Sequence, residues 1–522
     1  MARKPEAAEL ERAFPLNEFL NLPPEYDEFL NLLTTQIHEQ QGFRNRRDTN
    51  EKTKTALGVI LANLINARST ARDTVQEVEG GEQEQLTIGG WLSISLNNNS
   101  YVNSRYNNGL LSYRAVMRAL DFLRDQENAI PLVVEERRGF QDEGTGVSRN
   151  TRLRLKTSSY ELFLFREEGK EPLNPTLRAI PLTTNSTFRY PVSRLVHTPQ
   201  SEIIRLKNAD KVLVDYEDTE EVVEMRERLR VWNEFALTKW PDVFLTNDEF
   251  LALQGQAVDA DVEEAFRSAG ESHTRPIDLT HRWMYRVFNN GLWRHGGRLY
   301  GGWWQYVPSG LRNRITINTR PTVEIDFSNM QAAMIYARER LELPGDAYNL
   351  DGIDPSYRKL IKSTFFQMIN ARPRQRLRAP AANKLPPDVT FDDLRTLIAE
   401  KHAPIAGYLN TGIGIELQKI DAEIALDVML SAMEDDELVL PIHDSFIGKS
   451  TYADNLQNNM LRCYRERFEQ NINVDDVQPY QQVITLQAPA GEHYHEVEVD
   501  VDDLIEQDDY SGYRDRHPQF AN

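Results

Sequence analysis

One short stretch, Val323–Gln331, limits the possible folds of this chain more than any other. Its apolar residues alternate up to Asp326, and the spacing then becomes helical through Met330 and Met334. Alternation is typical of a half-buried strand, and spacing of three to four residues is typical of an amphipathic helix. The sequence therefore predicts a buried strand that ends in a carboxylate and leads directly into a helix.

A second carboxylate stands in a similar setting within Leu438–Ile447. Two short apolar runs flank His443, Asp444 and Ser445, which is the pattern of a hairpin with an acid at its turn. If the strand that ends at Asp326 pairs with this hairpin, two carboxylates meet at one end of a sheet.

A basic helix is predicted between the two carboxylates. Arg358, Lys362 and Phe366 follow one another at four-residue intervals and share a helical face. Two Mg²⁺ ions about 4 Å apart, held by rigid carboxylates on adjacent strands, neutralise the charge that develops in nucleotidyl transfer. An arginine and a lysine one turn apart can hold a triphosphate. This combination predicts a metal-dependent site that handles phosphate groups.

The bulk composition is that of a soluble globular protein, with 40% hydrophobic and 27% charged residues. At 522 residues the chain has room for two to four domains. It shows no apolar run of membrane-spanning length and no signal peptide, so we expect a cytoplasmic protein without a membrane partner. Cys463 is the single cysteine, which excludes a disulfide framework and a cysteine-rich zinc site.

The net charge of −20 opposes nucleic-acid binding, because phosphate contacts dominate such affinity. The distribution of charge matters more than its sum. Basic residues gather from Arg358 to Arg378, while Glu496–Asp509 holds eight acidic residues and no basic one. The arginines at 372–378 fit either a surface loop or the wall of a template path. For the acidic C-terminal segment we expect partial disorder, and we interpret His493 and His495 as part of that solvated segment.

A separate pattern in the N-terminal half indicates a winged helix-turn-helix. Ser112 is placed to cap a helix, a strand is predicted at 130–134, and a glycine-rich loop leads to a second strand at 151–156. This order of elements resembles a DNA-binding winged helix, and the alternative is a small α+β domain with a solvated basic face. The candidate DNA contacts are Arg114, Arg118, Arg149, Arg152 and Arg154.

Four elements in a fixed order resemble the family A DNA polymerases and the related phage-type single-subunit RNA polymerases. The resemblance covers about residues 280 to 470 and implies a right-hand palm with reduced, helical fingers. Any one element is a weak signal, whereas four in order form a strong one. They are Gly297-Arg298-Leu299, Asp326-Phe327-Ser328, the set Arg358, Lys362 and Phe366, and His443-Asp444.

The resemblance implies a role for each residue of the acidic pair and its surroundings. Asp326 and Asp444 correspond to the ligands of two Mg²⁺ ions, which Mn²⁺ can replace, and the Phe327 carbonyl to a further ligand. His443 corresponds to the residue that positions the primer end, and Arg298 to a residue that contacts the primer–template duplex.

The same resemblance assigns the basic helix to the incoming nucleoside triphosphate. Arg358 and Lys362 correspond to triphosphate ligands, and Phe366 to an aromatic residue stacked near the sugar. Motif B of both families usually continues to a tyrosine and a glycine, whereas this chain has Asn370 and Ala371.

The sugar preference is left open by two further departures from these families. Gln331 stands where many family A DNA polymerases have the glutamate that excludes a ribose 2′-hydroxyl, and its bulk favours deoxynucleotides. Ser445, which follows the aspartate of motif C, is instead typical of the RNA polymerases. The interval of 118 residues between Asp326 and Asp444 is short for either family and indicates small fingers.

We therefore expect an α+β, template-dependent nucleic-acid polymerase of phage or mobile-element origin, with a DNA product favoured, working on DNA in a bacterial or phage-infected cytoplasm. The alternatives are a DNA-dependent RNA polymerase or primase-like enzyme, a template-independent nucleotidyltransferase, and a non-catalytic replication initiator with a decayed polymerase fold. The predicted regions are a helical one at 1–85, the winged-helix module at 86–200, a helical thumb-like region at 201–290, the palm and fingers at 291–480, and the acidic tail at 481–522.

Overall fold

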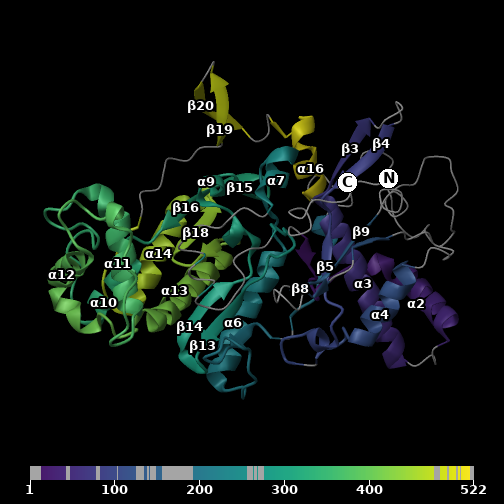
Figure 1. Cartoon of the computed structure of the whole chain (residues 1–522), viewed down its shortest axis with the longest axis horizontal. Helices are drawn as coiled ribbons and strands as arrows, with labels where there is room; N and C mark the ends of the chain where they lie inside the picture. The colour runs from purple at the N-terminus through teal and green to yellow at the C-terminus, as the bar shows by residue number, and fades with distance from the viewer. Residues whose placement is uncertain are drawn as a thin grey trace.

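The α+β fold class predicted from the sequence is confirmed by a computed structural model, in which helices surround several small sheets (Figure 1). One hydrophobic core runs through the molecule from Phe14 to Ile472. The structure describes residues 13–42, 47–77, 83–102, 104–124, 134–137, 140–141, 148–155, 192–200, 202–254, 276–474, 483–490, 493–500 and 507–517, together with 263, 267, 504 and 505.

The N-terminal unit consists of three helices packed on a mixed four-stranded sheet, at the right of Figure 1. Helix α3 is its centre, because residues 56–69 are all buried and contact α2, α4, β2, β5 and β9. Elements on both sides of the domain boundary expected near residue 85 therefore belong to one packed unit. The helices are α2 (Asp27–Gln41), α3 (Arg47–Ser69) and α4 (Tyr113–Arg124), and the sheet order is β1 (Phe14–Pro15), β5 (Leu92–Ile94), β9 (Thr151–Leu155) and β6 (Val134–Arg137).

Three small antiparallel pairs complete the N-terminal half. They are β2 (Leu20–Asn21) with β10 (Val196–His197), β3 (Arg72–Glu77) with β4 (Gln83–Ile88), and β7 (Phe140–Gln141) with β8 (Ser148–Arg149). Most of the expected strand at 130–134 and of the glycine-rich loop lies outside the described residues.

The helix expected after Ser112 is present as α4, and the Ser112 hydroxyl accepts a hydrogen bond from the Ala115 N–H at 3.4 Å. Two of the candidate DNA contacts are engaged within the unit. Arg152 donates to the Ser93 hydroxyl at 2.9 Å, and Arg154 is buried over the Trp91 ring at 4.4 Å. The exposed Arg114 remains the most accessible candidate whose side chain the structure describes.

The region at 201–290, expected to be helical and thumb-like, contains strands as well as helices. Helix α6 (Glu220–Leu237) begins after Thr219, whose hydroxyl caps it, and α7 (Asn247–Leu253) begins with a capping box at Thr246. The strands β11 (Ile204–Leu206), β13 (Tyr285–Asn289) and β14 (Leu292–Tyr300) form one three-stranded sheet.

A five-stranded sheet lies at the centre of the molecule, with α13 and α14 packed beside it (Figure 1). It brings together strands from distant parts of the sequence. The short elements η5 (Trp303–Tyr306) and α9 (Ser309–Arg312) lead into it. The strand order is β12 (Pro241–Val243), β15 (Ile315–Ile317), β16 (Arg320–Asp326), β18 (Ser445–Lys449) and β17 (Leu440–Ile442), and the helices are α13 (Gly414–Glu434) and α14 (Ala453–Phe468).

A helical lobe, residues 330–408, lies at the left of Figure 1, on the opposite side of the central sheet from the N-terminal unit. Its helices pack on one another and on α13. They are α10 (Met330–Arg338), α11 (Arg358–Asn370) and α12 (Phe391–Lys401), with the short η8 (Ala403–Tyr408).

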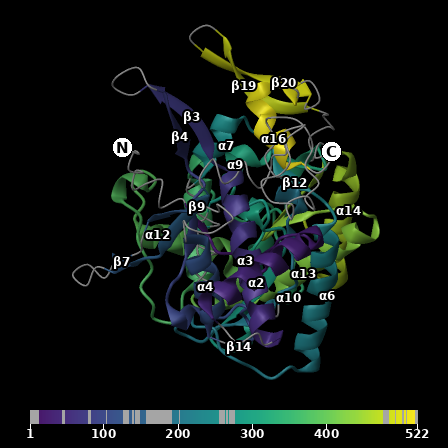
Figure 2. The same cartoon turned by 90° about the vertical axis from the view of Figure 1, so that its right-hand side faces the viewer.

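Part of the C-terminal segment, for which we expect partial disorder, forms regular elements. Strands β19 (Val483–Ala490) and β20 (His493–Asp500) form a hairpin that projects from the body of the molecule in Figure 2. Helix α16 (Ser511–Arg516) then packs against the body, because Tyr513 lies edge-on to Phe244 at 5.0 Å. The expected acidic tail is therefore partly a structured element.

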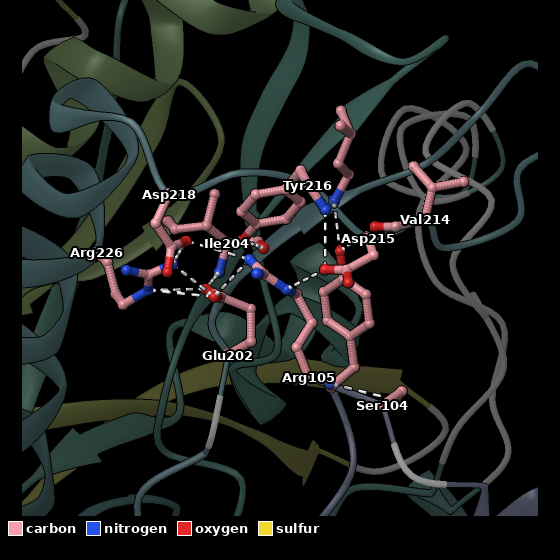
Figure 3. Close-up of polar contacts among 11 residues, drawn as sticks. Ser104, Arg105, Glu202, Ile204, Val214, Asp215, Tyr216, Asp218 and Arg226 are labelled. Atoms are coloured by element: carbon pink, nitrogen blue, oxygen red, sulfur yellow. Dashed lines mark hydrogen bonds and ion pairs between the residues drawn. The ribbon is translucent and has the colours of Figure 1, made fainter.

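An ion-pair network joins the N-terminal unit to the rest of the chain (Figure 3). Arg105 contacts Asp215 at 2.7 Å and Asp218 at 3.2 Å, and its guanidinium lies 3.9 Å from the centre of the Tyr216 ring. Arg226, on α6, contacts Asp218 at 2.7 Å. We call these residues, together with Glu202, the junction network.

Candidate active site

Strand pairing brings the two predicted carboxylates together. In the antiparallel pair β16–β18, Asp326 is directly opposite Ser445, so Asp326 lies next to the turn that carries Asp444. The Phe327 N–H donates to the Asp444 carbonyl at 3.2 Å, which ties the two chain segments together beyond the ladder. Asp326 and Asp444 are both half-buried. The hairpin and the strand predicted from sequence are thus present, and they meet at their acidic ends.

Two residues with positive φ shape this end of the sheet. His443 has φ of 57° in the turn between β17 and β18, and Asn329 has the same φ between β16 and α10. The left-handed region is uncommon for residues other than glycine, and such residues gather at functional sites. Both turns are therefore held in place by their surroundings.

Both ring nitrogens of His443 are shielded from solvent. Neither Nδ1 nor Nε2 has a hydrogen-bond partner within the described part of the chain, and the ring lies 5.7 Å from that of Tyr300. Burial, with smaller effects from Arg298 and Arg312, lowers the pKa of His443 well below its ordinary value. The imidazole is therefore neutral at pH 7 and keeps one nitrogen as an acceptor.

Arg298 lies in the interior, on the last part of β14. It is 8% exposed, and its Nε and Nη2 contact Asp421 Oδ2 at 2.9 and 2.8 Å. Burial alone would lower the pKa of Arg298, but the carboxylates of Asp421 and Asp444 raise it. Burial raises the pKa of Asp421 to about 6, against the opposing effect of Arg298.

The preceding Gly297 makes this placement of Arg298 possible. Gly297 has φ of 84°, and a Cβ there would lie 2.7 Å from the Phe288 ring. The register of β13 against β14 shifts next to it, at Phe288. The Gly-Arg element found in the sequence is therefore a backbone irregularity that directs an arginine inward.

The basic helix is present as α11, which begins at Arg358. Arg358 is about half exposed and forms an ion pair with Asp346, Nε to Oδ2 at 2.6 Å. The Lys362 Nζ lies 5.5 Å from the centre of the Phe366 ring, one turn further along the helix. Arg358, Lys362 and Phe366 share one face of the helix, as predicted. The Arg358 guanidinium is already paired with the Asp346 carboxylate.

Tyr348 is a residue of this region that no sequence pattern predicts. It is buried in the loop before α11, and its ring contacts Phe366 at 6.0 Å and the Arg358 guanidinium at 5.3 Å. Burial and the charges of Asp444 and Asp326 raise the pKa of its hydroxyl. Tyr348 thus packs against α11 and is affected by the charges of the acidic pair, and its loop has no periodic pattern from which it could be predicted.

Several buried polar atoms around this site have no hydrogen-bond partner among the described residues. They include the Gln331 Oε1, on the first turn of α10, and the Tyr348 hydroxyl, in addition to the His443 ring nitrogens. Leaving such a group unsatisfied costs about 1–3 kcal/mol. Their concentration here indicates a place where a ligand or ordered water completes the bonding.

The few protein donor atoms here fit Mg²⁺, whose coordination is completed by water and phosphate, better than they fit a metal ion bound by protein ligands alone. Nowhere in the described ranges do three or more His, Cys, Asp or Glu side chains gather in a way that could hold a metal ion. The predicted set is two carboxylates, Asp326 and Asp444, with the Phe327 carbonyl. Mg²⁺ is commonly bound by one or two carboxylates, several waters and substrate phosphates.

Further basic side chains gather near the start of α13. The arginines of the 372–378 loop are exposed, and a Cβ at Gly412, just before α13, would lie 3.9 Å from the Arg372 side chain. Burial and the charges of Lys207 and Arg372 lower the pKa of Lys211. Positive charge is therefore concentrated locally in a chain whose net charge is negative.

Comparison with known proteins adds no family. No family model matches this sequence, and no curated protein matches it either. The described part of the chain contains no helix long and apolar enough to cross a membrane. The function is therefore argued from the geometry of the site.

Proposed function

We propose that this protein is a template-dependent nucleic-acid polymerase, with DNA as the favoured product, built on a right-hand palm with small helical fingers. The observation that carries the proposal is the β16–β18 register, which brings Asp326 beside the turn of Asp444. Tyr348 links the basic helix to this turn, because its ring packs on Phe366 and Arg358 of α11 and the charges of Asp444 and Asp326 help to raise the pKa of its hydroxyl. In this proposal the central sheet is the palm and the lobe at 330–408 is the fingers.

In the proposed mechanism Asp326, Asp444 and the Phe327 carbonyl hold two divalent cations, Mg²⁺ or Mn²⁺. When bound, the cations supply charge neutralisation for the attacking and leaving oxygens. Arg358 and Lys362 bind the triphosphate of the incoming nucleotide, and Arg358 exchanges its contact with Asp346 for a phosphate oxygen.

Neutral His443 accepts or donates a hydrogen bond at the primer end and so orients it. Phe366 packs near the sugar, with Tyr348 behind it. Gln331 limits the space at the 2′ position from the first turn of α10. The direct duplex contact implied for Arg298 does not fit its burial, so our proposal gives Arg298 no contact with the duplex.

We further propose that the N-terminal unit binds DNA and recruits the polymerase, as in an enzyme of phage or mobile-element origin. Its winged-helix identity rests on the order of α4, the β7–β8 pair and β9. The exposed Arg114 is the first residue to test in this role.

The test is extension of a labelled primer–template with Mg²⁺, with dNTPs and NTPs in separate reactions and an unprimed template as control. We expect extension by the wild type with dNTPs. Asp326→Ala and Asp444→Ala should abolish extension, and Asp454→Ala, which removes an exposed acid on α14, should not. Extension by the Asp444→Ala protein would contradict the two-metal assignment.

Two other outcomes lead to different functions. Incorporation of NTPs without a primer would favour an RNA polymerase or primase-like enzyme, which the His443-Asp444-Ser445 sequence resembles. DNA binding without any incorporation would favour a non-catalytic replication initiator.

A further inference from the structure

The Arg298–Asp421 pair joins strand β14 to helix α13. Asp421 is 2% exposed and comes from the middle of α13, which packs along β14. Both guanidinium contacts go to the same carboxylate oxygen, at 2.9 and 2.8 Å. Such a pair costs much desolvation free energy, so it is weak evidence for a role in stability.

The chain that follows Arg298 contacts the hairpin that carries Asp444. Tyr300, two residues after Arg298, contacts the His443 ring at 5.7 Å. Trp304 Nε1 and Gln305 Nε2 donate to the Pro441 carbonyl at 3.0 and 3.5 Å. The chain that leaves β14 is therefore fixed to β17, just before the turn.

Arg298 is buried, and the Asp444 carboxylate is one of the charges that raise its pKa, which presents a specific chemical difficulty. In surroundings of low dielectric, an arginine without a partner would attract the Asp444 carboxylate and compete with a metal ion for it. Asp421 Oδ2 accepts from the Arg298 Nε and contacts its Nη2. The positive charge is thereby neutralised by an acid other than the candidate metal ligand.

We infer that Asp421 is a positioning residue for the candidate metal site: it neutralises Arg298 and so leaves the Asp444 carboxylate available to a divalent cation. The inference rests on the proposed function, because it takes Asp444 to be a metal ligand. It concerns a residue outside the four elements of the resemblance.

The test measures Mn²⁺ binding directly, by the electron paramagnetic resonance signal of free Mn²⁺, on the full-length protein without nucleic acid. Asp421→Asn should weaken Mn²⁺ binding by about 10–100-fold, the usual effect of losing a residue that supports a metal ligand. The double variant Asp421→Asn/Arg298→Met, which removes both charges, should restore binding to within about threefold of wild type. A simple structural role for Asp421 predicts no such recovery.

The outcomes separate this inference from the proposed function. If Asp326→Ala and Asp444→Ala abolish Mn²⁺ binding but Asp421→Asn does not weaken it, the inference is wrong and the metal site stands. If Mn²⁺ binding is the same in wild type, Asp326→Ala and Asp444→Ala, the proposed metal site itself is wrong, and the inference falls with it.

Circular dichroism identifies variants that do not fold. If Asp421→Asn is unfolded, the double variant decides alone, because a tenfold loss of Mn²⁺ binding in a folded double variant would overturn the inference.

Discussion

Two groups of charged residues hold this molecule together in different ways. Beside the candidate site, Arg298 and Asp421 form one pair that solvent hardly reaches, with side chains 10% and 3% exposed. At the junction network, Arg105 and Arg226 share several acids, and the exposed fraction ranges from 4% at Glu202 to 85% at Asp215. The same residue types thus act in two dielectric environments.

We expect the buried Arg298–Asp421 pair to be insensitive to ionic strength and the exposed pairs of the junction network to be sensitive to it. Dissolved salt weakens the attraction between exposed charges, with a Debye length of about 10 Å at 0.1 M, but affects buried pairs much less. An exposed pair also contributes little, about 0–1 kcal/mol, because water competes for both partners. We therefore expect the site to keep its geometry over a range of conditions, while the junction weakens as ionic strength rises.

The largest expected effect is the loss of primer extension in a variant of the candidate site that still binds DNA. Asp444→Ala should lower the rate of primer extension by at least about three orders of magnitude, because a metal ligand supplies several kcal/mol of transition-state stabilisation. DNA binding through the N-terminal unit should be unchanged. Electrophoretic mobility shifts beside extension assays measure both, and loss of DNA binding would show that the two regions are not separable.

The next effect compares the two arginines directly. Arg298→Met should lower the free energy of unfolding by about 3–5 kcal/mol, because it leaves the Asp421 carboxylate buried without its partner. Arg105→Met should cost only about 1 kcal/mol, since water can solvate most of its partners. Urea unfolding of both variants makes the measurement. Equal losses would remove the distinction drawn between the two groups.

Lowering the pH should reduce the free energy of unfolding through two buried histidines, His402 and His517, that belong to neither group of charged residues. Burial lowers the pKa of His402, in the helical lobe, to about 4, and that of His517, after α16, also to about 4. Protons then bind the unfolded chain more readily than the folded one between pH 6.5 and 4, so stability falls as the pH falls through that window. Each shift corresponds to roughly 3 kcal/mol.

Thermal unfolding between pH 7 and pH 4 measures this loss, and His402→Gln should reduce its size. His402 bonds to the Ala347 carbonyl at 3.0 Å, next to Tyr348, so the acid effect should also reach the candidate site. A flat profile over this range would contradict the burial of both rings.

The smallest expected effect concerns Asp346. Asp346→Asn should lower the KM for the incoming nucleotide by about two- to fivefold, since it weakens the exposed ion pair from which Arg358 is released on binding. The matched variant Arg358→Ala should raise the KM. Steady-state extension at varied nucleotide concentration tests both, and a raised KM for Asp346→Asn would show that Asp346 instead holds Arg358 in its binding position.

The sequence predicted those parts of the site whose pattern is local. The strand ending at Asp326, the hairpin at Asp444 and the helix from Arg358 each follow from alternation or four-residue spacing, and the structure has all three. Asp421 could not be predicted, because its meaning comes from Arg298, 123 residues away. In sequence it is only one acid within an amphipathic helix.

The C-terminal hairpin was missed for a different reason. Residues 496–500 alternate acid and valine, which is a strand pattern, whereas the density of negative charge in this segment favours partial disorder. The structure places this stretch in β20, paired with β19. In this stretch the alternating pattern, and not the acidic composition, corresponds to the observed structure.

The β16–β18 pairing also has a consequence for the order in which the protein folds. The two strands are joined by more than a hundred residues that include the helical lobe and α13. Contacts between residues so far apart in sequence form late, because the entropy of closing the loop must be overcome first. A nascent chain cannot assemble Asp326 with Asp444 until the strand at 445–449 has been synthesised. The N-terminal unit can therefore fold, and in our proposal bind DNA, before the proposed catalytic centre exists.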